Sequence, residues 1–399
     1  MTFFPEAKLK YQPRLGSVEV GRSSVYVTIA GASVFMLPGI KFFMFSSLPN
    51  LLVLTCLLIL ASFKLRRISL NLFQVRALVT LVFCLLIFLV SAFNSHISVT
   101  FETLARFLTA WLILFLIIIL AQTINFSQLA SLLLSWSVFI SVIYLFGIIT
   151  VSGAGNLSYL NLAMQVCIGI ALASGRLSFS KHKLLHLILT LFLFMVLLTL
   201  ASRGALLAAA VVLVINFTIL LVAAIKRMTL KLFGTLAVLL VAVRLASTRL
   251  GGHVNEYLLY KILEVELTET SRYWVYTEAI KAFASHPFGL GFQGYKAVLG
   301  YYPHNLYLEV GLDFGVVGLA VAGIVTLKFL FDYFCAVFSF SAGSLELGSF
   351  AISMLIIWQF SFDLGSAYMV FGAIILFFAS RTPFRNGEPV YIEQAKEYK

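Results

Sequence analysis

The chain has 399 residues, of which 61% are hydrophobic and only 11% are charged. Soluble proteins have about 45–50% apolar and about 25% charged residues, so this composition cannot cover a water-exposed surface. The formal net charge is +12, and the four cysteines stand singly in apolar runs, without the spacing of a metal site or a disulfide framework. These features exclude a soluble, disordered or disulfide-stabilised class and predict an all-α integral membrane protein.

Apolar runs long enough to cross a bilayer recur along the chain. Residues 1–24 are polar and lack the pattern of a signal peptide, so we expect a cytoplasmic N-terminal segment. Transmembrane helices are then predicted within 25–247, a re-entering helix and further spans within 304–380, and a cytoplasmic tail over 381–399. The predicted spans, about twelve by length, lie near 25–45, 47–63, 77–93, 107–122, 129–150, 158–175, 187–202, 204–225, 229–247, 315–337, 345–361 and 365–380.

The distribution of basic residues indicates the orientation of these spans. Most of the 28 Lys and Arg residues fall on one side, in the two termini and in the loops near Lys64, Arg176 and Lys226, together with Lys328 and Arg381. The positive-inside rule makes this the cytoplasmic side, with both termini on it. The basic excess is therefore explained by topology, and we expect no nucleic-acid partner.

One predicted loop, residues 248–303 on the extracytoplasmic side, is much longer than the others. Long loops in compact proteins usually carry function. Within it we predict a short helix over 255–266 and an amphipathic helix that begins at Thr270 or Ser271 and stops before His286. A glycine-rich turn follows. Three further glycines in the returning helix predict that this helix is broken or kinked; they are Gly311, Gly315 and Gly318.

Two arginines stand out, because ionisable groups at membrane depth are expensive and usually functional. Arg203 lies between two apolar runs on the extracytoplasmic side, and Gly204 beside it would let a ligand approach the backbone. The alternative is an arginine that only snorkels from a helix end. Arg272 lies at the start of the predicted loop helix, where a guanidinium and the helix dipole together suit an anion. Its alternative role is an ion pair with Glu269.

Four more residues near the same predicted face are candidates. Arg244 and Arg249 flank the end of the ninth predicted span, where snorkelling is an equal alternative. His304 stands just before the returning helix, beside Asn305, and a neutral imidazole there can act as a general base. Alternatively, His304 only bonds the backbone at the helix start.

Several enzyme classes lack their motifs in this chain. It has no phosphate-binding loop, no His-Glu-x-x-His helix, no Gly-x-Ser-x-Gly elbow and no dense acidic cluster, so we expect a reaction without a metal or cofactor. Arginines at the outer rim suit a lipid diphosphate, which they would bind and stabilise as it leaves. Aromatic residues around the loop, including Tyr273 and Tyr301, suit stacking on sugars, and a membrane-interface belt explains many of them equally well.

The order of several motifs resembles that of the O-antigen ligase and O-antigen polymerase superfamily (the WaaL and Wzy proteins of Gram-negative bacteria). The similarity extends over residues 203–319 in motif and over the whole chain in topology. The motifs are Ser202-Arg-Gly-Ala205, the loop helix with Arg272, His286-Pro-Phe-Gly-Leu-Gly291, His304-Asn-Leu-Tyr-Leu-Glu309 and Gly315-Val-Val-Gly318.

The resemblance implies a metal-independent, inverting glycosyltransferase of the GT-C type in the bacterial inner membrane. Its donor would be a glycan on undecaprenyl diphosphate at the periplasmic face. Arg203 and Arg272 would bind the diphosphate and His304 would be the base. Arg244 and Arg249 have no clear match to the motifs. The remaining predicted substrate-binding residues are Tyr273, Tyr301, Asn305 and Glu309.

The resemblance leaves the acceptor open. A polymerase transfers the glycan to another lipid-linked oligosaccharide repeat, and a ligase transfers it to lipid A–core; we favour the polymerase. A co-polymerase that regulates chain length is a partner implied by the resemblance alone, and membrane lipids surround the protein.

A transporter of lipid-linked oligosaccharides is a further hypothesis. Transporters with repeated halves would require a counterpart of the long loop in the first half of the chain, and the sequence has none. A structural partner in an envelope assembly is the last.

Overall fold

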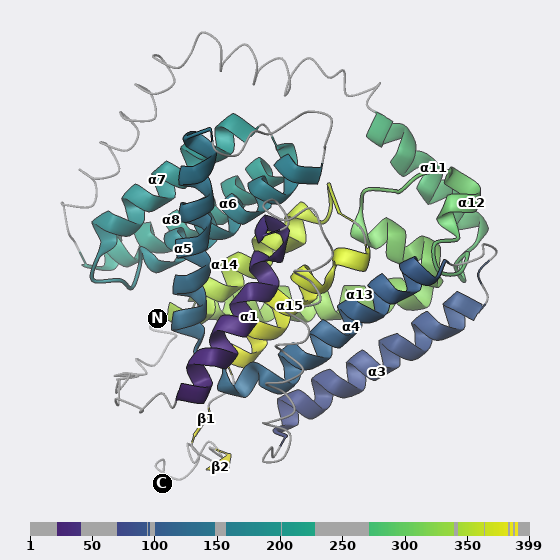
Figure 1. Cartoon of the computed structure of the whole chain (residues 1–399), viewed down its shortest axis with the longest axis horizontal. Coiled ribbons are helices and arrows are strands. Elements are labelled where there is room, and N and C mark those ends of the chain that lie inside the picture. Colours follow the sequence, from purple (N-terminus) through teal and green to yellow (C-terminus); the bar gives the residue numbers. More distant parts are fainter. Residues whose placement is uncertain are drawn as a thin grey trace, which may run out of the picture.

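The computed structural model describes residues 22–40, 70–93, 95, 100–147, 157–200, 202–227, 271–338, 342–362, 364–381, 384–385 and 388–389. These residues form a helical bundle with one very short hairpin (Figure 1). The hairpin pairs β1 (Phe384–Arg385) with β2 (Glu388–Pro389) in antiparallel fashion. The helices are α1 (Arg22–Ile40), α3 (Leu72–Phe93), α4 (Phe101–Leu120), η1 (Ala121–Thr123), α5 (Phe126–Leu145), α6 (Leu157–Arg176), α7 (Lys183–Leu200), α8 (Arg203–Arg227), α11 (Ser271–Ser285), α12 (Tyr295–Leu299), α13 (Leu306–Phe338), α14 (Ala342–Ile357), η2 (Leu364–Ser366) and α15 (Tyr368–Arg381).

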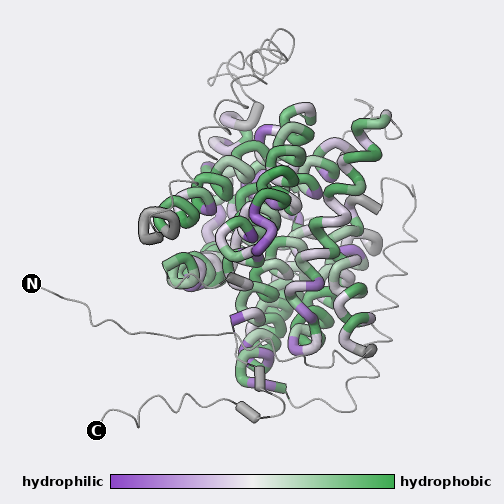
Figure 2. Tube along the Cα trace, turned by 90° about the vertical axis from the view of Figure 1, so that its left-hand side faces the viewer, coloured by the Kyte–Doolittle hydropathy of each residue, from purple (hydrophilic) through white to green (hydrophobic). Residues whose placement is uncertain are grey.

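Six helices in the described ranges are long and apolar enough to cross a membrane: Leu72–Phe93, Thr103–Thr123, Phe126–Leu145, Lys183–Leu200, Arg203–Val222 and Leu306–Phe338. Three shorter apolar helices accompany them: Ser24–Pro38, Gly343–Ile357 and Tyr368–Arg381. Hydrophobic residues run along nearly all of these helices (Figure 2). The architecture is that of a multi-pass membrane protein. The predicted spans near 47–63 and 229–247 and the short helix over 255–266 lie outside the described residues, so the number of about twelve spans stays a prediction.

The helix α6 forms the centre of the larger half of the bundle, packed against α5, α7, α8 and α14. Small residues let its neighbours approach closely: a Cβ added to Gly169 would lie 2.6 Å from the Cβ of Ser137 on α5. Polar groups then bond across the contact. Ser137 Oγ donates to the Gln165 carbonyl (2.7 Å), and Gln165 Nε2 donates to the Phe35 carbonyl of α1 (2.8 Å). Close approach and interhelical hydrogen bonds are how helices associate in lipid.

A second buried polar chain ties α6 to α8, α14 and α13. Asn216 Nδ2 donates to Ser174 Oγ (2.8 Å), Ser349 Oγ donates to Asn216 Oδ1 (3.1 Å), and the Tyr333 hydroxyl lies 3.2 Å from Ser349 Oγ. The four side chains of this hydrogen-bonded network are all buried in the apolar core of the bundle. A satisfied network of this kind fixes the register of helices that are otherwise uniformly apolar.

The helix α14 runs from one end of the bundle to the other. Near its start, Glu346 pairs with Arg176 at the end of α6, with 3.1 Å between Oε2 and Nε. Beyond its end, the turn over 358–361 contacts the segment that leads into α13. Arg176 belongs to the side that the sequence predicts as cytoplasmic, so this turn lies at the opposite end of the bundle.

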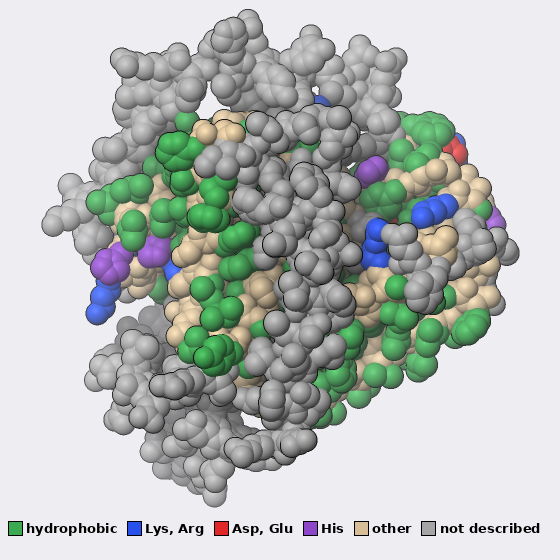
Figure 3. Space-filling model, in the orientation of Figure 1, with side chains coloured by type: hydrophobic (Ala, Val, Ile, Leu, Met, Phe, Trp, Pro, Cys, Tyr) green, Lys and Arg blue, Asp and Glu red, His purple; other side chains and the backbone are tan. Residues whose placement is uncertain are grey.

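The outer surface of the bundle suits a lipid environment. Large apolar side chains are exposed along α3, and Val79, Leu86 and Val90 each leave more than half of their surface uncovered. On the face shown in Figure 3, the described surface is mostly hydrophobic and the basic side chains form only small groups. In water such a surface would drive aggregation, whereas lipid tails cover it at no cost.

Candidate functional site

The turn over 358–361, after α14, contacts three segments that are far apart in the sequence. Leu306 N donates to the Trp358 carbonyl (3.1 Å), which fixes the start of α13. The Gln359 carbonyl accepts from the Tyr276 hydroxyl of α11 (3.1 Å) and from Asn305 Nδ2 (3.3 Å). On a third side, α8 reaches the same turn at its first residues. The turn is therefore the common support of the predicted site.

Arg203 is the first residue of α8, and its side chain is exposed. Its neighbour Gly204 packs against the turn so closely that an added Cβ would lie 3.1 Å from the Cβ of Phe360. The Arg203 guanidinium makes no hydrogen bond or ion pair with another residue that the structure describes. The amide groups of the first turn of α8 add the positive end of a helix dipole beside it. A guanidinium and a helix start together form a setting for an anion.

Arg272 is the second residue of α11, which begins at Ser271, one of the two predicted starts. Tyr276, one turn further along the same helix, donates its hydroxyl to the Gln359 carbonyl (3.1 Å). Tyr276 also donates its hydroxyl to the His304 carbonyl (3.4 Å). The helix that carries Arg272 is thereby anchored to the segment that carries His304.

His304 adopts a left-handed backbone conformation, with φ 53°, and its side chain is exposed. Its ring meets the Tyr302 ring edge-on, with 4.8 Å between the centroids. A non-glycine residue in this conformation costs about 1–2 kcal/mol and persists only where its surroundings enforce it. Here the enforcing contacts are the hydrogen bonds of Asn305 and Tyr276 on either side of the His304 peptide.

Asn305 and Glu309, both predicted to bind substrate, have structural partners. Asn305 Oδ1 accepts from the amides of Tyr307 (3.0 Å) and Leu308 (3.1 Å), so Asn305 caps α13. Glu309 is buried, and its Oε2 accepts from Leu364 N (2.7 Å) in η2. These bonds place the start of α13; the predicted contacts of both residues with substrate stay predictions.

The glycine-rich motif 286–291 docks onto the break in α13. The break is at Gly315, with φ 65° and ψ −159°, at one of the predicted glycines. Across it, Leu290 N donates to the Leu312 carbonyl (2.7 Å) and Val316 N donates to the Pro287 carbonyl (2.8 Å). A Cβ on Gly315 would lie 2.3 Å from the backbone carbon of Phe288. The two glycine-rich motifs are therefore one packing unit, which the sequence does not reveal.

The same unit is held by the end of α3. Ser91 Oγ donates to the Asp313 carbonyl (2.8 Å), and Ser95 Oγ donates to the Phe292 carbonyl (2.9 Å). The Phe292 ring packs edge-on against Phe88, with 4.7 Å between centroids. Ser91 and Ser95 gave no signal in the sequence, because a serine in an apolar helix is common and its partner here is a backbone carbonyl.

Aromatic side chains lie along α11 beside this unit. Tyr273 and Trp274 are 64% and 57% exposed, and the Trp274 ring lies 5.4 Å from Tyr301 between centroids. Desolvation, and then the charge of Glu278, raise the pKa of the Tyr301 phenol. A tyrosine phenol is protonated at neutral pH even at its ordinary pKa, and this shift moves its deprotonation to still higher pH.

The remaining predicted site residues are not placed. Arg244 and Arg249 lie outside the described residues, and so does Glu269, the alternative partner of Arg272. Within the described ranges, no group of three or more His, Cys, Asp or Glu side chains is suited to hold a metal ion.

Comparison with protein families bears on the same region. Residues 188–323 match a family described as O-antigen ligase. The match runs from α7 into α13 and includes Arg203, Arg272 and His304. No curated protein and no solved structure matches the chain significantly. The match supports the superfamily that the motifs resemble and an O-antigen ligase or polymerase type of function, and it does not separate the two activities.

Proposed function

We propose that the chain is an O-antigen polymerase, a glycosyltransferase that transfers a glycan from undecaprenyl diphosphate to another lipid-linked oligosaccharide repeat. One observation carries the proposal: the start of α8, the helix α11 and the His304 segment all meet at the turn 358–361. The family match over the same residues supports the reaction type. The site would face the periplasm in the inner membrane.

In this mechanism the diphosphate of the donor lies at the start of α8, held by Arg203, with Arg272 as its second guanidinium. His304 removes the proton from a hydroxyl of the acceptor sugar. The hydroxyl oxygen attacks the anomeric carbon of the donor from the face opposite the diphosphate, and the bond to the diphosphate oxygen breaks. The guanidinium groups stabilise the charge that develops on the leaving diphosphate. The anomeric configuration is inverted.

The exposure of His304 and Arg203 suits large substrates. Both side chains stand at the surface of the described structure and are not enclosed in a sealed cavity. Two lipid-linked glycans can approach such a site from the membrane and leave it again. Tyr273 and Trp274 provide exposed rings on α11 for the sugars, and the half-buried Tyr301 lies against Trp274.

The ligase reaction is the second candidate, because the matched family is described as O-antigen ligase. Deletion of the chain from its host separates the two. Loss of a polymerase leaves lipopolysaccharide with at most one repeat, whereas loss of a ligase leaves bare core and long glycans on the polyprenyl carrier.

The direct test uses the purified chain in detergent with a defined lipid-linked repeat. Elongated glycan on the lipid is the expected product, and it would also exclude a pure transporter, because no second compartment is present. Lys281→Ala, on α11 but ion-paired to Glu278, is the matched control for loss of a cation. Full activity of both Arg203→Ala and Arg272→Ala would contradict the proposed diphosphate site.

A further inference from the structure

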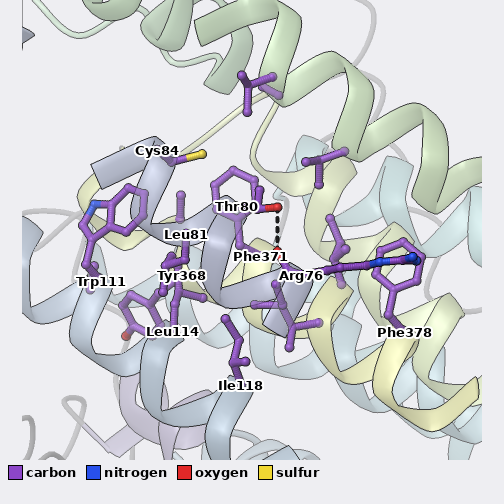
Figure 4. Close-up of a pocket in the computed structure, with 18 of the residues that line it drawn as sticks. Arg76, Thr80, Leu81, Cys84, Trp111, Leu114, Ile118, Tyr368, Phe371 and Phe378 are labelled. Carbon is purple, nitrogen blue, oxygen red and sulfur yellow. Dashed lines mark hydrogen bonds between the residues drawn. The ribbon is translucent and has the colours of Figure 1, made fainter. Parts of the chain in front are cut away.

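A groove of about 640 Å³ lies between α3, α4, α13 and α15 (Figure 4). At one end it reaches Phe88, Phe314 and Leu364, beside the glycine-rich unit described above. Its walls are almost entirely apolar, and side chains such as Leu81, Trp111, Leu114 and Phe371 face into it from three of these helices. In a protein surrounded by lipid, an apolar groove of this kind is suited to a hydrocarbon chain.

The other end of the groove is cationic. Arg76 of α3, Lys328 of α13 and Arg381 of α15 all line it, with Asp332 as the one carboxylate among the described lining residues. Lys328 Nζ pairs with Asp332 Oδ2 (2.8 Å), and Arg381 Nη1 donates to the Asp332 carbonyl. Lys328 also lies 5.6 Å from the centre of the Phe378 ring. Three cations from three helices thus line a groove that has a single acidic side chain, and Lys328 alone pairs with that carboxylate.

Arg76 differs from the other two cations at this end, which both bond Asp332. Its guanidinium makes no hydrogen bond or ion pair with any residue that the structure describes, and its side chain extends toward Phe378 (Figure 4). An arginine in this position has all its donors available for a phosphate, which it binds in a bidentate fashion.

This cationic end lies far from the proposed diphosphate site. The break at Gly315 divides α13 into two helical parts, and Lys328 lies 13 positions beyond the break, which corresponds to roughly 20 Å of helix. That is about two thirds of the roughly 30 Å hydrocarbon core of a bilayer. A phosphate bound here would therefore be a different group from a diphosphate held by Arg203. Arg76, Lys328 and Arg381 also belong to the side that the sequence predicts as cytoplasmic.

We propose that this groove binds an anionic phospholipid, with its phosphate against Arg76, Lys328 and Arg381 and an acyl chain along the apolar walls. The wall formed by α3 between Arg76 and Phe88 rises about 18 Å, slightly more than half of the roughly 30 Å hydrocarbon core. One acyl chain anchored at the cationic end is therefore matched in length. Basic pockets between helices on the cytoplasmic side are a known setting for anionic headgroups. The proposal does not depend on the enzymatic activity.

The test measures the thermal unfolding midpoint of the full chain in detergent during titration with phosphatidylglycerol, phosphatidylcholine or inorganic phosphate. We expect only phosphatidylglycerol to raise the midpoint. Arg76→Gln combined with Arg381→Gln should weaken its apparent affinity about tenfold or more. Lys181→Gln combined with Lys183→Gln removes the same charge from exposed positions outside the groove and should leave it unchanged.

A second pair of variants separates binding from stability. Val321→Trp fills the groove, whereas Ile324→Trp lies on the same helix, is 67% exposed in the unmodified chain and does not line it. Native mass spectrometry should find phosphatidylglycerol on the second variant and not on the first. Equal stabilisation by phosphatidylcholine or by inorganic phosphate would overturn the proposal. So would loss of phosphatidylglycerol on addition of the polyprenyl donor, because the groove would then belong to the donor tail.

Discussion

His304 is held in its position by its backbone more than by its side chain. The left-handed conformation at φ 53° is enclosed between the cap formed by Asn305 and the hydroxyl of Tyr276, which donates to the His304 carbonyl. The imidazole itself projects to the surface, and its ring meets that of Tyr302 edge-on. A base held in this way keeps its direction while remaining open to a large acceptor.

His304→Ala should therefore remove catalysis and preserve donor binding. Loss of a general base typically lowers a rate by about 10²–10⁴-fold, and the diphosphate contacts of Arg203 are not touched. Single-turnover rates and donor binding, measured separately on the purified protein, check both parts. His182→Ala, an exposed histidine beside α7, is the control. A variant that loses donor binding in proportion to its rate would show that His304 binds and does not act as the base.

Two substitutions of Asn305 should separate its role as a helix cap from its hydrogen bond to the Gln359 carbonyl. Asn305→Ala removes the cap of α13 and should destabilise the protein by about 1 kcal/mol. Asn305→Asp keeps an oxygen acceptor for the amides of Tyr307 and Leu308 but loses the donor to the Gln359 carbonyl. We expect Asn305→Asp to restore the unfolding midpoint and to remain slow in glycan transfer. Equal activity of Asn305→Asp and the unmodified chain would contradict the positioning role.

At the scale of helices, the apolar windows predict each described span but place most starts too late. The predicted spans near 77–93 and 129–150 begin at Leu72 and Phe126 instead. The reason is the polar first turn. Asn71 and Gln74 cap each other's backbone amides (2.8 and 3.1 Å) as a capping box, and Asn125 caps α5. The Asn-x-x-Gln spacing was present in the sequence, and hydropathy alone does not register it.

The difference matters for Arg76, which a hydropathy reading assigns to a loop. In the structure it lies on the second turn of α3 and lines the groove. Arginine is tolerated at this depth because its long side chain can carry the charge toward the membrane surface.

The docking of the two glycine motifs makes Gly315 irreplaceable. Gly315→Ala would put a Cβ against the backbone of Phe288 at a positive φ, which cannot relax by a side-chain rotation. We expect at least about 2 kcal/mol of destabilisation. Gly323→Ala is the matched control on the same helix, because nothing lies within 4 Å of its Cβ position. It should be neutral or stabilising by up to about 1 kcal/mol. Unfolding midpoints in detergent compare the two, and similar values would contradict the docking.

For the whole molecule, composition and the long apolar runs were enough to predict the helical membrane class and the approximate positions of the apolar helices that the structure describes. The motifs also predict that Arg203, Arg272 and His304 form one site, and this stays a prediction; the structure shows that the helices and segment carrying them contact one turn. Their common support was not predicted, because the turn 358–361 acts through backbone carbonyls and carries no chemical signature. A hydrogen bond from a distant residue to a backbone carbonyl depends on how the helices pack. Because every residue has a carbonyl, such a bond cannot be predicted from the sequence pattern.

The proposed orientation can be tested on the whole molecule. In a background without cysteine, Lys181→Cys and Lys281→Cys each place one exposed thiol, at opposite predicted faces. An impermeant thiol reagent applied to intact spheroplasts should label only Lys281→Cys, and both should react after lysis. Labelling of Lys181→Cys in intact cells would reverse the orientation and move the proposed site to the cytoplasm.

The short helix α14 links both ends of the molecule through rigid contacts. Its start is clamped by Arg176, and Gly348 in its second turn lies so close to Tyr333 that an added Cβ would come within 2.3 Å of the ring. The turn beyond its far end carries the carbonyls that α11 and the His304 segment bond, and the Phe360 side chain on which Gly204 of α8 packs. An axial shift of α14 would therefore move the start of α8, which carries Arg203, together with the segment that carries His304. The distance between Arg203 and His304 would then stay the same while the depth of both residues relative to the membrane surface changes.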